Sequence, residues 1–399
     1  MNKLMFDSGL KSQVMSFPEA VRAHLDGVKK GMTAPLFPSD DLLAGIKRIY
    51  ITGCGDCNAA YVALVPLMRL MLGSSCRVYA DLPVNMSRYV SLEIEESSLD
   101  KYENCLMIVL SVGGSPARLV ETVLRAKRRG MHTMAVTNTP DSPVGRAADY
   151  ILHVNNPPFP FMSPGCRDYL GTMLGTLLSA ARISDLRGGK GGCHASCVEK
   201  AVLSLADSYG EILSAMDDFI FDFALSVKDC VTSVECVADG YGLASALFFP
   251  AKIIETSGRF GSFTDSISFR STSLHFSEPE KILTLIYGCL GGSNRESIAA
   301  SVHMAVKAGR PVLFIADAPA REFGITDDVA CFVIPKAPDE YPMLGTFFDH
   351  LPGDLLAAYL CSFWGENYFR NDGTVTAWSA PALIPPKASK IVIVEDGVC

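Results

Sequence analysis

The sequence lacks the features of membrane, secreted and nucleic-acid-binding proteins. It has no continuous apolar run of about 18 residues and no low-complexity tract, which favours a soluble globular chain with no membrane partner. Its start, MNKLMFDSGLKSQ, has no apolar core followed by a small-residue cleavage site, so we expect no secretory signal and a cytoplasmic protein. Basic residues number 35 against 43 acidic ones, which disfavours nonspecific binding to nucleic acid.

Patterns for cofactors and metals are also missing. No GxGxxG precedes a suitably spaced acidic residue, and the 7 histidines are dispersed along the chain. We therefore expect no metal and no cofactor. The 13 cysteines are scattered over a long chain and are interpreted as reduced thiols. In Arg187–Cys193, Lys190 is followed by Gly191 rather than Ser or Thr, so this stretch predicts a linker and not a phosphate-binding P-loop.

An internal repeat dominates what is present. The stretch Leu106–Asn138 returns in altered form as Ile282–Asp317, with Gly113-Gly114-Ser115 aligned with Gly291-Gly292-Ser293 at an offset of 178. A steady offset over dozens of residues indicates two copies of one folding unit. Each copy runs apolar strand, Gly-rich turn, amphipathic helix and apolar strand. This alternation predicts an α/β fold with parallel sheets covered by helices on both faces.

A strand followed by Gly-x-Gly also occurs twice. Lys47–Ile51 leads into Gly53-Cys54-Gly55, and Val234–Ala238 leads into Gly240-Tyr241-Gly242. A helix that starts after such a turn can offer backbone N–H groups to an anion. The Ser-rich stretch Ser257–Ser273 is expected to be a loop. The chain is predicted to divide into an N-terminal helical arm (1–45), a first domain (46–186), a Gly-rich linker (187–193), a second domain (194–380) and a tail that closes the site (381–399).

This organisation resembles the sugar isomerase (SIS) family over nearly the whole chain from about residue 15. Gly53-Cys54-Gly55 matches the family's first loop and Leu110-Ser111-x-x-Gly114 its second. Ala251-Lys252-Ile-Ile-Glu255 is similar to the helix that carries the catalytic glutamate, and 388–395 to the tail that brings a lysine into the site. The closest pattern is that of the isomerase half of glucosamine-6-phosphate synthase and of the fructosamine-6-phosphate deglycases. The resemblance implies two tandem, flavodoxin-like, three-layer αβα domains.

The resemblance also implies catalytic roles. Glu255 would move a proton between adjacent sugar carbons, with Lys390 as the tail lysine. An aldose–ketose interconversion needs a base and a positive group for the enediolate oxygen. Lys252 shares a helix face with Glu255 and can tune it, the alternative being an ordinary exposed ion pair. His275 is the candidate for the family's ring-opening histidine; otherwise it is a loop histidine.

The expected ligand cradle departs from the family in places. Its residues are Cys54, Gly55, Asp56, Cys57, Ser111, Gly113, Gly114, Ser115, Arg118 and Lys252. Asp56 and Cys57 replace hydroxyl side chains that usually bind phosphate. Asp56 either caps the following helix or competes with a phosphate there. Cys54 and Cys57 have redox spacing, but their glycine loop is explained by the family.

Two functions remain open from the sequence. The first is a phosphosugar isomerase or deglycase that acts on an amino-sugar or other sugar phosphate by aldose–ketose proton transfer. The second is a non-catalytic sugar-binding or regulatory protein, which the altered phosphate loop favours. In either case the partner is a small sugar or sugar phosphate. We expect a homodimer, because sites in this family form at subunit boundaries and the helical arm suits such a contact.

Overall fold

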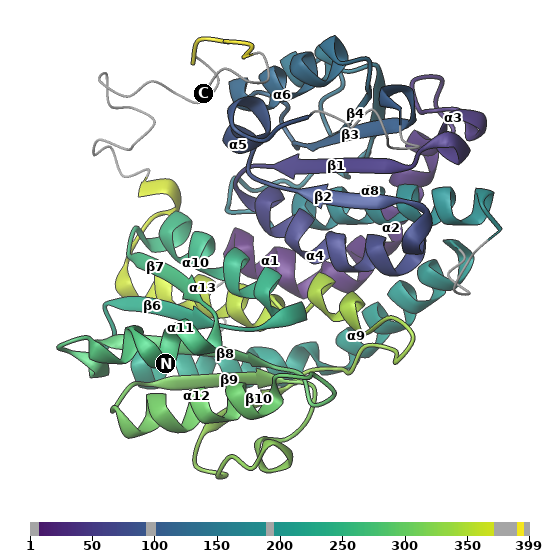
Figure 1. The fold of residues 1–399 in the computed structure, drawn as a ribbon. Helices are drawn as coiled ribbons and strands as arrows, with labels where there is room; N and C mark the ends of the chain where they lie inside the picture. Colours follow the sequence, from purple (N-terminus) through teal and green to yellow (C-terminus); the bar gives the residue numbers. More distant parts are fainter. Residues whose placement is uncertain (1–7, 93–100, 189–194, 371–388, 395–399) are drawn as a thin grey trace. The chain divides into compact units, whose positions relative to one another are not determined.

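The computed structural model describes residues 8–92, 101–188, 195–370 and 389–394. Its strands form two five-stranded sheets, and the neighbouring strands in both sheets are parallel (Figure 1). By contacts the chain divides into two compact units, one around each sheet. The first-sheet unit contains 20–158, 167–202 and the tail, and the second-sheet unit contains the residues before 20, 159–166 and 203–379. We describe each unit by itself.

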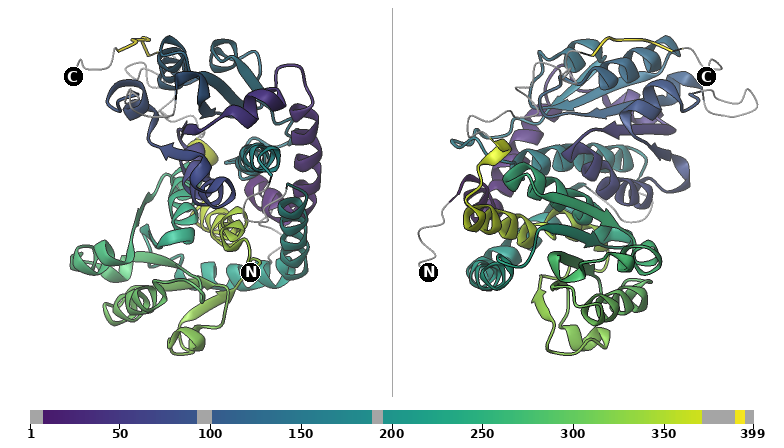
Figure 2. Two further views of the ribbon diagram at one scale, coloured as in Figure 1. Left: turned by 45° about the vertical axis from the view of Figure 1, so that its right-hand side comes forward. Right: turned by 90° about the vertical axis from the view of Figure 1, so that its left-hand side faces the viewer.

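The first sheet has the order β2-β1-β3-β4-β5. Every residue of β3 is buried, as its continuous apolar sequence predicts. The sheet packs between α4 and α8 on one face and the shorter α5, α6 and α7 on the other (Figures 1 and 2). The elements of this unit are β1 (Arg48–Gly53), α4 (Asp56–Leu72), η2 (Gly73–Ser75), β2 (Arg77–Ala80), α5 (Pro83–Arg88), η3 (Tyr102–Asn104), β3 (Cys105–Leu110), α6 (Ala117–Arg128), β4 (His132–Thr137), α7 (Pro143–Ala147), β5 (Tyr150–His153) and α8 (Arg167–Leu186).

The second sheet repeats this arrangement in the order β10-β9-β8-β6-β7. Helices α10 and α13 pack together on one face, and α11 and α12 pack together on the other (Figure 1). The elements are β6 (Ser233–Val237), η4 (Gly240–Gly242), α10 (Leu243–Ser257), β7 (Phe260–Thr264), α11 (Ser266–Ser271), η5 (Ser273–His275), η6 (Pro279–Lys281), β8 (Ile282–Gly288), α12 (Arg295–Lys307), β9 (Val312–Ala316), η7 (Ala320–Phe323), β10 (Ala330–Val333), η8 (Pro342–Phe347), α13 (Leu351–Trp364) and η9 (Tyr368–Arg370).

The two sheets confirm the predicted α/β duplication. If β6 is equated with β1 and β8 with β3, the strand orders become identical. The helices α6 and α12 are followed at the same distance by Gly130 and Gly309, both with φ of +82°. These glycines lie 179 residues apart, and each ends its helix in a conformation that favours glycine.

The expectation of a loop at Ser257–Ser273 is wrong. This stretch contains β7 and α11. Strand β7 is an edge strand that pairs only with β6, and its residues are partly or largely exposed. Its Phe-Gly-Ser-Phe-Thr sequence has little of the continuous apolar character that identifies the central strands.

The N-terminal helices are α1 (Gly9–Met15), α2 (Phe17–Met32) and α3 (Asp40–Gly45). Their apolar positions, such as Leu10, Val14, Val21 and Leu25, are at most 2 % exposed within the single chain. The 33-residue helix α9 (Ala195–Val227) opens the second half. Most of the expected linker and of the expected tail lies outside the described residues. Helix α4 is long and apolar enough to cross a membrane by length and composition, but 61 % of its apolar stretch is buried, which is typical of a core helix.

Candidate functional site

The loops of the predicted ligand cradle lie at one edge of the first sheet, and we call this part the first cradle. Strands β1 and β3 are adjacent and parallel, and their last residues, Gly53 and Leu110, are paired in register. The loops 54–57 and 111–115 therefore leave the sheet side by side. In the order β2-β1-β3-β4-β5 the chain turns outward in opposite directions from this pair. Such a switch point is where open parallel sheets generally bind ligands.

Several polar groups of this cradle bond to one another. The Gly114 N–H donates to Ser111 Oγ at 3.1 Å, and Ser115 Oγ donates to the Gly113 carbonyl at 3.3 Å. Gly114 has a φ of +59°, and a Cβ there would lie 1.8 Å from Ser142 Oγ. The turn is therefore closely packed, and two of its donors, the Gly114 N–H and the Ser115 hydroxyl, already have partners inside the loop.

The start of α4 corrects the expectation that Asp56 caps the helix. The N-cap is Gly55, which has no side chain, and Asp56 stands in the first turn of the helix. Its charge is favourable beside the helix N-terminus without being a cap. Burial raises the pKa of both the Cys54 and the Cys57 thiols. Both are therefore neutral at physiological pH, which disfavours a reactive dithiol.

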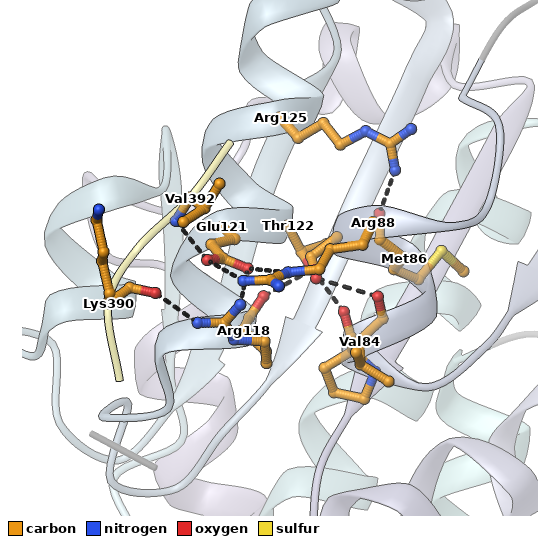
Figure 3. A network of polar contacts seen from close by, with 11 residues as sticks. Val84, Met86, Arg88, Arg118, Glu121, Thr122, Arg125, Lys390 and Val392 are labelled. Carbon is orange, nitrogen blue, oxygen red and sulfur yellow. Dashed lines mark hydrogen bonds and ion pairs between the residues drawn. The ribbon is translucent and has the colours of Figure 1, made fainter. Parts of the chain in front are cut away.

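Arg118 belongs to a network around a fully buried acid, Glu121 (Figure 3). Arg118 Nη1 lies 2.7 Å from Glu121 Oε2, and Arg88 Nη2 lies 3.2 Å from Oε1. The Val392 N–H donates to Oε1 at 2.5 Å. Arg118 Nη2 also donates to the Lys390 carbonyl at 2.6 Å. A residue expected to bind phosphate thus pairs with a buried carboxylate and holds the tail segment 389–394.

Lys390 is exposed, and it is the backbone of this residue that the network holds. Figure 3 shows its side chain extending away from Glu121. The tail lysine is therefore anchored at its main chain while its ammonium group stays accessible.

Lys252 and Glu255 form a close pair on α10. Lys252 Nζ lies 2.6 Å from Glu255 Oε2, with the lysine side chain 0 % and the glutamate side chain 33 % exposed. The ammonium also lies 4.6 Å from the centre of the Phe248 ring, a cation–π contact. The alternative of an ordinary exposed ion pair does not describe this geometry, because the lysine is completely buried.

Two histidines of the second half, His275 and His350, differ in environment. His275 ends the short helix η5 and is exposed. His350 is fully buried, with Nδ1 2.7 Å from Asp354 Oδ2 and Nε2 3.2 Å from the Phe347 carbonyl. His350 therefore packs as part of the core, while His275 is available at the surface.

A cavity of about 540 Å³ lies at the corresponding edge of the second sheet, and the sequence analysis missed it. It is bordered by the loops that follow β6, β8, β9 and β10, and its polar side chains include Asp239, Tyr241, Cys289, Ser293, Asn294, Arg295, Asp317, Lys336, Asp339 and Asp349. The internal repeat could have indicated it, since this edge is the duplicate of the first cradle.

Two carboxylates shape the electrostatics of the cavity. Asp317 Oδ1 accepts from the Leu290 N–H at 2.7 Å, and Asp349 Oδ1 accepts from Tyr209 Oη at 2.9 Å. Burial, assisted by the nearby Asp317 charge, raises the pKa of Asp349 to about 6. Burial and the same two carboxylates raise the pKa of Cys289 to about 11. Among the described residues no group of three or more potential metal ligands occurs here or elsewhere.

Comparison with known proteins places the first half of the chain in a family. The model of the SIS domain matches residues 42–170, which span the first sheet and its cradle. Residues 42–170 therefore match a SIS domain. The glutamine–fructose-6-phosphate aminotransferase of Corynebacterium diphtheriae is 24 % identical over 251 residues, or 62 % of this chain and 38 % of that protein. Alignments with the seven curated relatives cover 16–38 % of their length.

Solved structures share the fold of this chain over both sheets. The C-terminal domain of glucosamine-fructose-6-phosphate aminotransferase from Francisella tularensis has a TM-score of 0.72 at 13 % identity, covering 92 % of this chain and 99 % of that chain. The tagatose-6-phosphate ketose/aldose isomerase of Escherichia coli has a TM-score of 0.69 at 11 % identity, covering 98 % and 97 %. The expected tandem three-layer SIS fold is thereby confirmed.

Proposed function

We propose that this protein is an enzyme that binds a sugar phosphate, in particular an amino-sugar derivative, and moves a proton between adjacent carbons as an isomerase or deglycase does. The observation that carries the proposal is the pair of Lys252 and Glu255. A fully buried ammonium 2.6 Å from one oxygen fixes the carboxylate while one third of the glutamate side chain stays accessible. A general base needs such a fixed orientation together with access to the substrate.

In the proposed reaction Glu255 takes the proton from the carbon next to the carbonyl. The electron pair of that C–H bond forms the enediolate, the proton held by Glu255 can exchange with solvent, and Glu255 then protonates the former carbonyl carbon while a hydroxyl proton moves from one oxygen to the other. No outside oxidant or reductant is needed. Lys252 supplies positive charge for the enediolate oxygen, and His275 assists ring opening.

Proton exchange with solvent tests this proposal directly. The protein is incubated in D₂O with a panel of sugar and amino-sugar phosphates, and NMR follows deuterium entering C1 or C2. We expect exchange in the wild type and a loss of about 10²–10⁴-fold in Glu255→Gln. Glu278→Gln is the matched control, because Glu278 forms an exposed i, i+3 pair with Lys281. Equal loss in both variants, or exchange that survives Glu255→Gln, would refute the role of Glu255.

A second candidate function is sugar binding without chemistry. It is favoured by the first cradle, in which Ser111, Ser115 and Arg118 already bond to groups of the protein. Ligand-dependent thermal stabilisation with no deuterium exchange for any sugar would establish this candidate in place of the enzyme.

We also propose a cytoplasmic homodimer. The apolar face of the N-terminal helices is buried within one chain, so we do not assign the subunit contact to that face. Sedimentation equilibrium at micromolar concentration would test the dimer, and a single species of 43.0 kDa would contradict it.

A further inference from the structure

The cavity at the edge of the second sheet has no part in the reaction proposed above. It lies at the start of α10, where the loop Gly240–Gly242 meets the loop after β8. Glu255 lies near the other end of the same helix, about 18 Å along the axis at 1.5 Å per residue. A volume of about 540 Å³ is within the range of small-molecule sites. The cavity also occupies the switch point of its sheet, between β6 and β8.

The interior of this cavity is acidic, although two basic groups interact electrostatically with its carboxylates, Lys336 with Asp317 and His350 with Asp349. Within the described part of the chain, neither Asp317 nor Asp349 forms an ion pair, although each accepts a hydrogen bond from a neutral donor. A third acid, Asp239, accepts hydrogen bonds from the Ser266 N–H, the Ser266 hydroxyl and the Asn294 side-chain amide, at donor–acceptor distances of 2.6–3.2 Å. All three acids thus accept hydrogen bonds from neutral donors, but Asp317 and Asp349 also repel each other, so a cation would be stabilised most between these two.

The rim of the cavity has a different character. Arg295 is exposed at the first position of α12, and Lys336 is exposed and paired with Asp339 at 2.6 Å. Tyr241 and Ser293 contribute hydroxyl groups. The site thus combines carboxylates inside with hydroxyl groups and an arginine near the opening.

We propose that this cavity is a second ligand site, which binds a polyhydroxylated small molecule that carries a protonated amine, that is, an amino sugar. An ammonium group would lie between Asp317 and Asp349, where it forms charge-assisted hydrogen bonds and relieves the repulsion between the two acids. The sugar hydroxyls would meet Tyr241 and Ser293. A phosphate on the same molecule would meet Arg295 and the N-terminus of α12.

The proposal is tested by calorimetric titration of the full chain carrying Glu255→Gln, so that turnover is removed and binding is read separately from the proposed reaction. The probes at pH 7 are glucosamine, glucosamine 6-phosphate, glucose and glucose 6-phosphate. We expect both amines to bind at least tenfold more tightly than their amine-free counterparts. The comparison between glucosamine and its phosphate shows whether the phosphate adds affinity.

Variants locate the site. Asp349→Asn and Asp317→Asn keep the shape and an acceptor oxygen but remove the charge, and each should weaken amine binding about tenfold or more. Asp229→Asn is the control, since its side chain is 87 % exposed and outside the cavity lining. Ser293→Phe fills the cavity from an exposed loop without changing a carboxylate and should abolish binding. No preference for amines, or amine binding that survives all three cavity variants, would overturn the proposal. Deuterium exchange by the protein with Glu255 intact tests the proposed reaction separately, so either proposal can fail without the other.

Discussion

The substitution Glu255→Gln should destabilise the second-sheet unit as well as affect chemistry. Lys252 is completely buried, so neutralising its partner leaves a buried ammonium with less compensation. Breaking a buried ion pair by removing one partner generally costs about 3–5 kcal/mol. Because Glu255 is one-third exposed and water can approach the pair from that side, we expect about 2–4 kcal/mol. The exposed pair of Glu278 and Lys281 should lose much less stability on Glu278→Gln, because solvent screens it.

A double variant separates the two effects. Lys252→Met with Glu255→Gln replaces the buried charge by an apolar side chain beside Phe248, so it should recover stability to within about 1 kcal/mol of the wild type. Native-state hydrogen exchange of the α10 amides, measured by mass spectrometry, reports on this unit alone. If Glu255→Gln costs no more than Glu278→Gln, or if the double variant is no more stable than the single one, the reasoning from burial is wrong. A stable double variant without deuterium exchange would assign the loss of activity to chemistry.

Three further outcomes follow from the described contacts. Glu121→Gln should weaken the acceptor of the Val392 N–H, so that this amide exchanges at least several-fold faster in hydrogen-exchange experiments while the β3 amides are unchanged. Asp349 has a folded-state pKa of about 6, above the unfolded value of 3.8, so the folded state holds its proton more tightly. The resulting stabilisation is complete below about pH 4 and is lost as the pH rises through 6, which lowers the free energy of unfolding by about 1–3 kcal/mol. Urea titrations should show this loss in the wild type and not in Asp349→Asn. Gly114→Ala should cost about 1–3 kcal/mol in urea unfolding, because φ is +59° and the Cβ site is occupied, whereas Gly113→Ala, with nothing within 4 Å, should cost much less.

The fold was largely predictable because the central strands are buried on both faces. Cys105–Leu110 and Ile282–Gly288 read as continuous apolar runs, and such runs, alternating with amphipathic helices, identify parallel sheets. The edge strand Phe260–Thr264 was missed because an edge strand is held by one neighbour and can tolerate a polar, Gly-containing sequence.

The candidate sites were predictable only in part. Lys252 and Glu255 lie three residues apart, so their contact follows from helical periodicity alone. Asp317 and Asp349 lie in separate loops, and only the sheet topology brings both to one cavity. Glu121 is a further example, because its partner Val392 is 271 residues away and no local pattern indicates that contact.

Comparison of the two copies bears on why one chain would have two different ligand sites. At an offset of 178, Ser111 of the first copy corresponds to Cys289 of the second, and at 179 Asn138 corresponds to Asp317. Asn138 is neutral and its Oδ1 accepts from the Asn156 N–H at 2.9 Å, whereas Asp317 brings a negative charge into its cavity. The same edge of the same fold is thus neutral at this position in one copy and acidic in the other. A carboxylate attracts an amine and repels a phosphate. The difference between Asn138 and Asp317 therefore disfavours binding of a phosphate at the second position, and Asp317→Asn should shift the second site from amines towards anionic groups.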